Sequence, residues 1–236
     1  MPNDTTTLPR ILAFDVFGTV VDWHGSIVRE VDALGLGVDA VVFARDWRAG
    51  YKPAMARVMS GELGWMRIDA LHRIILEEVL SKHGVTSLDD TAKDDLNRAW
   101  HRLDPWPDTV AALTRLKTRF MLCTLSNGNI GLLADMAKRA GLPWDCVLSA
   151  EVFHKYKPDP GTYLGVADVF DAAPNDVMLV AAHQSDLDAA RDCGLRCAYI
   201  ERIDEFGADA PKDISGDARN NFHARDLADL ADQLNC

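Results

Sequence analysis

Four short polar clusters carry the residue types that could do chemistry in this chain of 236 residues. Each cluster follows an apolar run, and the clusters lie at residues 15–19, 126–129, 155–159 and 183–186. Together they supply two carboxylates (Asp15 and Asp186), an ammonium (Lys157), a hydroxyl (Ser126) and amide donors. A carboxylate that a neighbouring cation keeps ionised can act as a covalent nucleophile. The residue types therefore predict nucleophilic catalysis by a carboxylate.

Each cluster taken alone also fits an ordinary structural role. An aspartate after an apolar strand is commonly a turn residue, and Ser-Asn-Gly is a common loop. Lys157-Pro158-Asp159 fits a turn before a helix, and Asp186 fits the first turn of a helix, where the dipole favours a carboxylate. A functional site is favoured because all four clusters occur in order, each at the end of a predicted strand.

The elements that must position these clusters alternate between strand and helix. Apolar runs predict strands at residues 11–14, 120–125, 146–148, 177–181 and 196–200. Helical spacing predicts helices at residues 130–140, 162–170, 187–193 and 224–234. This alternation is typical of an α/β fold with a doubly wound parallel sheet, in which ligands bind beyond the carboxyl ends of the strands.

The segment between the first two strands has a different character, because apolar residues recur there at helical spacing. We therefore expect two domains. Residues 1–22 and 105–236 form an α/β core, and residues 23–104 form an all-helical insertion. Residues 204–221 are expected to be a long polar surface loop.

Composition and charge limit the kinds of partner. The formal net charge of −11 disfavours nucleic acid and anionic membranes as partners. No run approaches the roughly 18 apolar residues that a membrane span needs, and residues 1–9 lack the pattern of a secretory signal. Five cysteines without a CxxC pair favour a reduced, cytoplasmic protein with free thiols.

The four clusters resemble the four motifs of the haloacid dehalogenase superfamily. Residues 14–20 are similar to the first motif, Ser126-Asn127-Gly128 to the second and Lys157-Pro158-Asp159 to the third, while the stretch to Asp186 is similar to the fourth. The resemblance spans nearly the whole chain. It implies a Rossmann-like core with a helical cap domain inserted after the first motif.

One position points to a branch of this superfamily. In the phosphatases of this superfamily the first motif has the pattern Asp-x-Asp, and its second carboxylate is a general acid. Phe17 occupies that second position here. An aromatic residue there is similar to the 2-haloacid dehalogenases, whose halide leaving group needs no proton. Arg48, which follows Trp47, resembles the arginine that contacts the halide in those enzymes, and Tyr163 matches a site tyrosine of the same group.

Two positions depart from the best-studied dehalogenases. Ala181 stands where a serine is often found, and His183 where an asparagine is often found. These differences bear on how Lys157 and the hydrolytic water are held. His183 also introduces a group that titrates near neutral pH.

The resemblance implies a two-step reaction. Asp15 displaces halide from the substrate carbon, with inversion, and forms an aspartyl ester. Water activated by Asp186, with help from His183, then cleaves that ester. Lys157 keeps Asp15 ionised, and Thr19 hydrogen-bonds Asp15.

The same resemblance assigns substrate contacts. Ser126 and the backbone amides after Asp15 would bind the substrate carboxylate, while Arg48 and Asn127 would receive the halide. Phe17 and Tyr163 would line the site. These local donors would give an acidic protein the positive field that an anionic substrate needs.

Partners and cofactors follow from this hypothesis. The substrate would be a small 2-halocarboxylate of the L configuration, the released product a halide ion, and no metal or other cofactor would be needed. A homodimer is expected from the resemblance alone. The alternatives are a magnesium-dependent phosphatase or phosphonatase-type hydrolase of the same fold, which Phe17 disfavours, and a non-catalytic binding protein, which Asp15, Lys157 and Asp186 disfavour.

Overall fold

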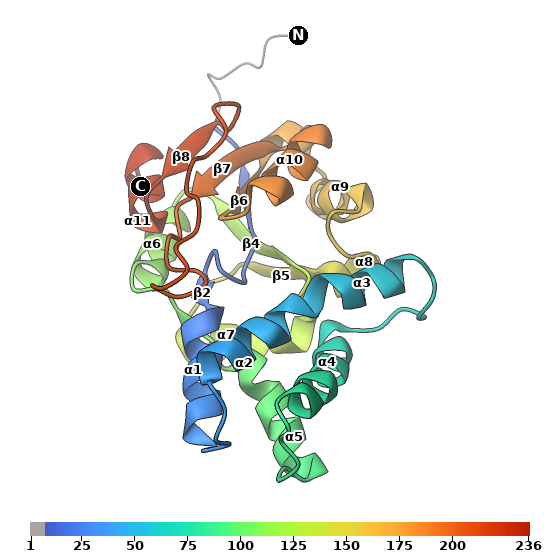
Figure 1. Cartoon of the computed structure of the whole chain (residues 1–236). Helices are drawn as coiled ribbons and strands as arrows, with labels where there is room; N and C mark the ends of the chain where they lie inside the picture. Colours follow the sequence, from blue (N-terminus) through green and yellow to red (C-terminus); the bar gives the residue numbers. More distant parts are fainter. Residues whose placement is uncertain (1–7) are drawn as a thin grey trace.

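A six-stranded parallel sheet forms the centre of the chain in the computed structural model, which describes residues 8–236 (Figure 1). The strands are β1 (Ile11–Phe14), β4 (Met121–Ser126), β5 (Cys146–Ser149), β6 (Val177–Ala181), β7 (Arg196–Ile200) and β8 (Phe222–Ala224). Their spatial order is β5-β4-β1-β6-β7-β8. Counted along the chain, this is the 3-2-1-4-5-6 order of a doubly wound sheet, and its switch point lies between β1 and β6.

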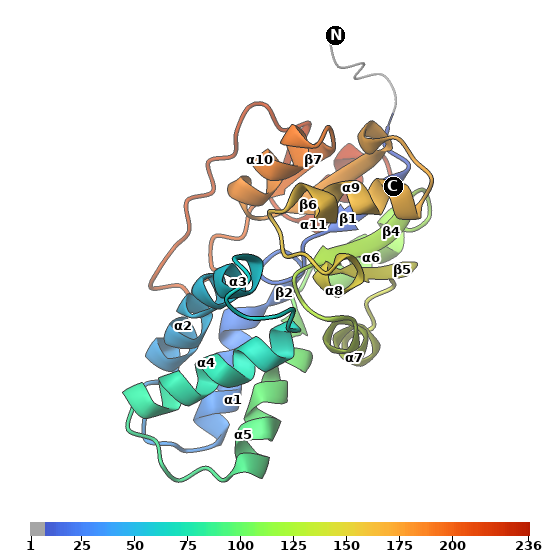
Figure 2. The ribbon, with the colours of Figure 1, turned by 90° about the vertical axis from the view of Figure 1, so that its right-hand side faces the viewer.

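Helices cover both faces of this sheet, as Figure 2 shows. One face packs against α6 (Thr109–Leu116), α7 (Ile130–Ala140) and α11 (Leu227–Gln233). The other packs against α8 (Ala150–Phe153), α9 (Pro160–Val169) and α10 (Gln184–Asp192). Leu12 and Phe14 of β1 face the first set and Ile11 and Ala13 the second, because successive side chains of a strand point to opposite faces. The predicted α/β class is confirmed.

The segment after β1 is helical, as predicted. Its elements are α1 (Trp23–Ala33), α2 (Ala40–Ala49), α3 (Tyr51–Met59), α4 (Ile68–Lys82), α5 (Asp90–Asn97) and the 3₁₀ turn η1 (Arg98–His101). In Figure 1 they lie below the sheet. The two ends of the segment meet in a short antiparallel pair, β2 (Val21–Asp22) with β3 (Asp104–Pro105). The domain boundaries at residues 22/23 and 104/105 remain a prediction.

Buried aromatic side chains hold the helical insertion together. Trp47 and Trp100 are fully buried, with ring centres 5.4 Å apart in an edge-to-face arrangement. Trp100 also stacks on His72 at 4.3 Å. This cluster continues without a break into the helix-covered face of the sheet. The insertion is therefore anchored on the core by apolar packing.

The loop between β7 and β8 corrects the expectation for residues 204–221. It contains no helix or strand, but it is not simply a surface loop, because Glu205 is fully buried. Figure 2 shows the loop running from the sheet to the level of α2 and α3. There Arg45 of α2 donates to the Phe206 carbonyl oxygen at 2.7 Å. The three-residue strand β8 was not predicted, because so short an edge strand depends on its pairing with β7.

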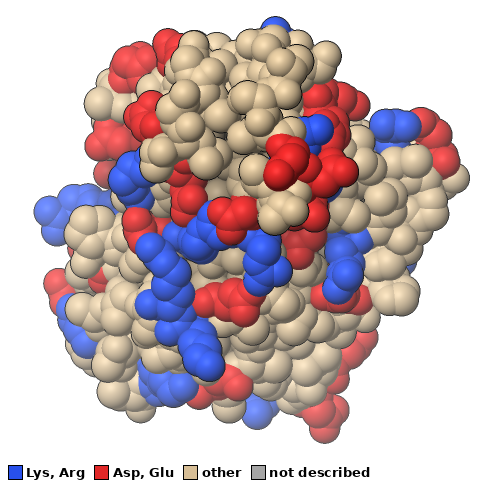
Figure 3. Space-filling model, turned by 90° about the horizontal axis from the view of Figure 1, so that it is seen from below, with Lys and Arg blue, Asp and Glu red and all other residues tan. Residues whose placement is uncertain are grey.

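The surface of the insertion mixes both signs of charge. Figure 3, seen from below, shows basic and acidic side chains intermingled on this face. Arg102, for example, pairs with Glu30 at 2.9 Å and with Asp95 at 3.3 Å. Within residues 8–236, no helix combines the length and apolar character that crossing a bilayer requires.

Candidate active site

Asp15 lies at the carboxyl end of β1, at the switch point of the sheet. Its backbone N–H donates to the Val180 carbonyl oxygen at 3.0 Å, which fixes the residue beside β6. The Thr19 hydroxyl donates to Asp15 Oδ2 at 2.8 Å and itself accepts the Ala182 N–H at 2.9 Å. The hydrogen bond expected between Thr19 and Asp15 is therefore present, and it ties Asp15 to both central strands.

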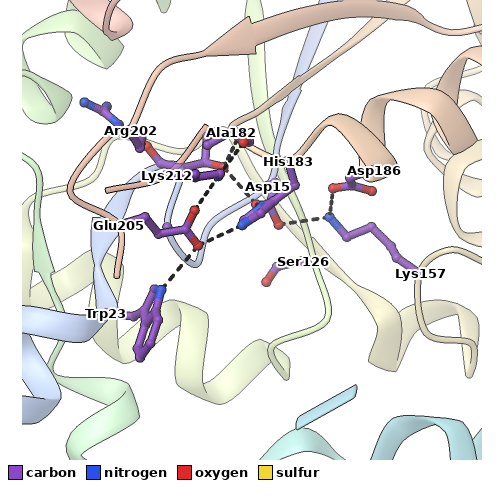
Figure 4. A network of polar contacts seen from close by, with 12 residues as sticks. Asp15, Trp23, Ser126, Lys157, Ala182, His183, Asp186, Arg202, Glu205 and Lys212 are labelled. Carbon is purple, nitrogen blue, oxygen red and sulfur yellow. Dashed lines mark hydrogen bonds and ion pairs between the residues drawn. The ribbon is translucent and has the colours of Figure 1, made fainter. Parts of the chain in front are cut away.

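Lys157 joins the two carboxylates of the site (Figure 4). Its Nζ lies 3.0 Å from Asp15 Oδ1 and 2.5 Å from Asp186 Oδ2. The Tyr163 hydroxyl donates to the other oxygen of Asp186 at 2.6 Å. Residues from β1, the loop between α8 and α9, α9 itself and α10 thus meet at the carboxyl edge of the sheet. Contrary to the expectation from the sequence, Lys157 does not directly follow a strand, because the short helix α8 lies between it and β5.

This arrangement sets the charge of Asp15. Burial alone would raise the pKa of Asp15, but the Lys157 ammonium and His183 hold that pKa well below its usual value. Burial would lower the pKa of Lys157, but Asp15 and Asp186 keep it above its usual value. The pair is ionised at neutral pH, which is the state that a nucleophilic carboxylate needs.

His183 stands between two carboxylates. Its Nδ1 lies 3.0 Å from Asp15 Oδ2 and its Nε2 lies 2.8 Å from Glu205 Oε1. The second oxygen of Glu205 accepts from Lys212 Nζ at 2.5 Å, and Trp23 Nε1 donates to Oε1 at 3.3 Å. Against the cost of burial, Glu205 and Asp15 raise the pKa of His183 to about 9.

Phe17 has an apolar, buried side chain that cannot transfer a proton. Its side chain is 2% exposed and packs edge-to-face on Trp100, with ring centres 5.9 Å apart. Phe17 therefore joins the buried aromatic cluster of the insertion to the loop after β1. The position where the phosphatase pattern has a second carboxylate is apolar and closely packed here.

Arg48 enters the site from α2. Its guanidinium carbon lies 4.2 Å from the ring centre of Tyr51, 5.4 Å from that of Trp23 and 5.8 Å from that of Phe17. Its Nη1 is buried and has no hydrogen-bond partner among residues 8–236. A buried N–H donor without a partner is costly, so this atom is suited to receive a bound anion.

The two polar residues after β4 have different positions. Asn127 lines the pocket, and its Oδ1 accepts the Lys157 N–H at 2.8 Å. Ser126 is fully buried, does not line the pocket and accepts the Gly128 N–H at 3.0 Å. The structure thus brings Asn127 to the pocket, while Ser126 supports the loop that follows β4.

A pocket of about 1130 Å³ lies between the insertion and the core. From the core it is lined by Asp15, Phe17, Asn127, Tyr156, Lys157, Pro158, Asp159, Tyr163, His183, Ser185, Asp186, Glu205 and Phe206. From the insertion it is lined by Trp23, Arg45, Arg48, Ala49, Tyr51, Lys52, Met55, Ala56, Met59 and Ser60. Four carboxylates, two arginines, two lysines and His183 therefore surround a largely apolar space.

The cation that contacts both Asp15 and Asp186 is the Lys157 ammonium. No three His, Cys, Asp or Glu side chains in residues 8–236 are placed to hold a metal ion. Lys157 lies between Asp15 and Asp186 and already balances their charge. Lys157 can therefore supply the positive charge beside Asp15.

Two site residues were missed by sequence reasoning. Glu205 lies in a polar loop where nothing distinguishes it from neighbouring carboxylates, so no local signal could have identified it. Tyr51 lies three residues after Arg48, a spacing that places two side chains on one helix face. That signal was available for Tyr51, although the helix is interrupted between the two residues at Gly50.

Comparison with known proteins agrees with this fold. A family model described as haloacid dehalogenase-like hydrolase matches residues 9–194. The chain therefore belongs to the haloacid dehalogenase-like hydrolases.

Within that family the chain is similar to the defluorinating L-2-haloacid dehalogenase Rha0230. The two are 43% identical with a TM-score of 0.95, covering 99% of this chain and 98% of that one. It is also 29% identical to (S)-2-haloacid dehalogenase 4A of Burkholderia cepacia, over 82% of this chain and 83% of the relative. Phosphoglycolate phosphatase 1 of Pseudomonas aeruginosa is a weaker match, 25% identical over 98% of this chain and 83% of that protein.

Proposed function

We propose that this protein hydrolyses the carbon–halogen bond of small 2-haloalkanoic acids, such as haloacetates and L-2-halopropionates, to 2-hydroxy acids. One observation carries the proposal. The Asp15 carboxylate, which Lys157 keeps ionised, faces the pocket. Residue 17, where the phosphatase pattern has a proton-donating aspartate, is the buried Phe17. Such a site suits a leaving group that departs as a stable anion.

In the first step, Asp15 attacks the carbon that bears the halogen, from the side opposite the carbon–halogen bond. That bond breaks, its electron pair leaves with the halide, and a carboxylate ester joins Asp15 to the substrate. Arg48, with its unpartnered Nη1, stabilises the departing halide together with Asn127. The substrate carboxylate is held by the backbone amides after Asp15. Ser126, which does not line the pocket, instead accepts the Gly128 N–H and so fixes the loop after β4.

In the second step, water attacks the Asp15 carbonyl carbon. Asp186 accepts the proton of the water, and the bond between Asp15 and the product oxygen breaks. Lys157, which contacts both Asp15 and Asp186, can protonate the leaving oxygen and recover a proton from Asp186. Asp15 keeps one oxygen of the water and releases the remaining proton to solvent, which restores its carboxylate. The substrate carbon ends inverted.

The phosphatase alternative fits these residues less well. Phosphomonoester hydrolysis expels an alkoxide, which needs a proton, and a buried aromatic ring at position 17 cannot supply one. A non-catalytic binding protein would have no use for a buried carboxylate held in its ionised state.

The isotope content of Asp15 after one turnover in ¹⁸O-labelled water tests the proposal. With enzyme in excess over L-2-chloropropionate, we expect chloride release, unlabelled lactate of the D configuration and ¹⁸O in the peptide that contains Asp15. Label that enters lactate directly would refute the ester route. Chelator should leave chloride release unchanged, and magnesium-dependent phosphate release from an aryl phosphate would favour the alternative.

Two finer parts of the proposal concern assembly and location. A homodimer rests on the family resemblance, and light scattering after size-exclusion chromatography would test it. A cytoplasmic location is supported by the five free cysteines, since reduced thiols are typical of that compartment.

A further inference from the structure

The two ring nitrogens of His183 both face carboxylate oxygens. Nδ1 lies 3.0 Å from Asp15 Oδ2, and Nε2 lies 2.8 Å from Glu205 Oε1. An ionised carboxylate only accepts hydrogen bonds, so each nitrogen must donate. A neutral imidazole has one N–H, and its bare nitrogen would then face a carboxylate oxygen. Both contacts are satisfied only when His183 is an imidazolium.

The surroundings of Glu205 keep it ionised next to His183, which stabilises the imidazolium form of His183. Its side chain is fully buried, and Lys212 Nζ bonds its Oε2 at 2.5 Å while donating also to the Ala182 carbonyl oxygen at 2.5 Å. Against the cost of burial, His183 and Lys212 lower the pKa of Glu205 to about 2. Gly18 leaves room for the carboxylate, because a Cβ there would lie 2.3 Å from Glu205 Oε1.

The two oxygens of Asp15 have different surroundings. Oδ2 accepts from both Thr19, at 2.8 Å, and His183, at 3.0 Å, whereas Oδ1 has Lys157 as its one partner among residues 8–236. Two donors reduce the electron density available on Oδ2, so Oδ1 is the better nucleophile. Once Oδ1 is esterified, Oδ2 is the carbonyl oxygen on which negative charge collects when water attacks.

We propose that Glu205 is a positioning residue that keeps His183 doubly protonated, so that His183 Nδ1–H and the Thr19 hydroxyl form the oxyanion hole for hydrolysis of the Asp15 ester. The oxyanion role in ester hydrolysis rests on the proposed function, whereas the double protonation of His183 does not. It replaces the expectation that His183 helps to activate water, because an imidazolium has no lone pair with which to accept a proton.

The charged groups around His183 agree with this assignment. Asp15 and Glu205 contact the ring directly, and Lys157 and Lys212 lie on the far sides of those carboxylates. Arg45 and Arg48 of α2 line the same pocket. The raised pKa means that His183 is charged below about pH 9 and loses its charge above it.

Nitrogen-15 NMR of the histidine rings in the resting enzyme tests the first half. We expect both ring nitrogens of His183 to be protonated at pH 7, with the signal identified by its loss in His183→Asn. Glu205→Gln should lower the pKa of His183 by about one to two units. Glu201→Gln is the matched control, because Glu201 forms an exposed pair with His223 at 2.8 Å, and it should leave His183 unchanged.

Rapid-quench kinetics test the second half. Glu205→Gln should slow ester hydrolysis by about 10- to 100-fold, so that halide appears in a burst equal to the enzyme concentration and mass spectrometry detects the ester on Asp15. The alkaline limit of kcat should move down with the pKa of His183. A merely structural role would lower activity at all pH values without a burst.

Each outcome has a clear meaning. A neutral His183 at pH 7, or an unchanged His183 pKa in Glu205→Gln, would overturn the proposal whether or not the protein is a dehalogenase. A shifted pKa without ester accumulation would overturn the oxyanion role. If Glu205→Gln does not fold, Glu205→Gln/Lys212→Met removes both buried charges and gives the same readouts. A wild-type enzyme that releases no halide, with His183 still an imidazolium, would refute the proposed function alone.

Discussion

The Arg48 guanidinium lies over the ring of Tyr51, with its carbon 4.2 Å from the ring centre. The rings of Trp23 and Phe17 also lie close to this cation, with ring centres at 5.4 Å and 5.8 Å. A cation in such surroundings attracts an anion more strongly than one in water. Residues of both the insertion and the core therefore hold the guanidinium at the pocket, where we propose that it receives the halide.

Replacing Arg48 should impair halide departure. We expect Arg48→Met to lower kcat/KM for L-2-chloropropionate by about 10²- to 10³-fold, because developing charge on the halide loses its donor. Product inhibition by bromide should weaken in parallel. The control is Arg45→Met on the same helix, because Arg45 already bonds Phe206 and Asp209. Equal losses in the two variants would show that overall charge, and not the position of Arg48, matters.

Lys157 should be required for the ionised state of Asp15. Lys157→Met removes the cation that opposes the cost of burying Asp15, so the pKa of Asp15 should rise and halide release should fall by about 10³-fold or more. Steady-state chloride assays from pH 4 to pH 10 would measure both effects. Lys155→Met, two residues earlier and half-exposed in a pair with Asp159, should retain activity within about twofold. Similar losses for both lysines would contradict the assignment.

Phe17 should tolerate no carboxylate. Phe17→Asp places an ionisable group at a position 2% exposed, against Trp100 and His72, and loses the packing of the ring. We expect the free energy of unfolding to fall by about 3–5 kcal/mol, measured by urea denaturation, with no gain of phosphatase activity. Phe17→Leu should cost less, because it keeps an apolar side chain. A stable Phe17→Asp that hydrolyses phosphate esters would reopen the phosphatase alternative.

Gly18 should be more sensitive to a methyl group than other glycines of similar conformation. Its φ is +84°, and an added Cβ would collide with Glu205. We expect Gly18→Ala to lower the free energy of unfolding by about 1–3 kcal/mol and to displace Glu205 from His183, which lowers the His183 pKa. Gly141→Ala is the comparison, since its φ is +70° but a Cβ there would meet nothing within 4 Å. Equal effects on the His183 pKa would show that the contact with Glu205 is unimportant.

Local sequence patterns were sufficient for most of the core. Strands β1, β6 and β7 have the predicted bounds, because a central strand of a parallel sheet is buried on both faces and reads as a short continuous apolar run. The polar residue that ends each run then lies at the common edge. The convergence of Asp15, His183 and Asp186 follows from that geometry, whereas Lys157 reaches the site from the loop after the short helix α8.

Tertiary structure decided what depends on contacts between distant segments. The short strands β2, β3 and β8 exist only through their pairing partners, and no periodicity marks them. Glu205 carries no signal in the sequence, since its role depends on the fold of the loop after β7. That fold brings Glu205 to His183 and Trp23 and places Lys212 of the same loop beside it. The sequence alone determined which groups could do chemistry. The fold determined the protonation state of His183, because charge in a buried site depends on which carboxylates surround it.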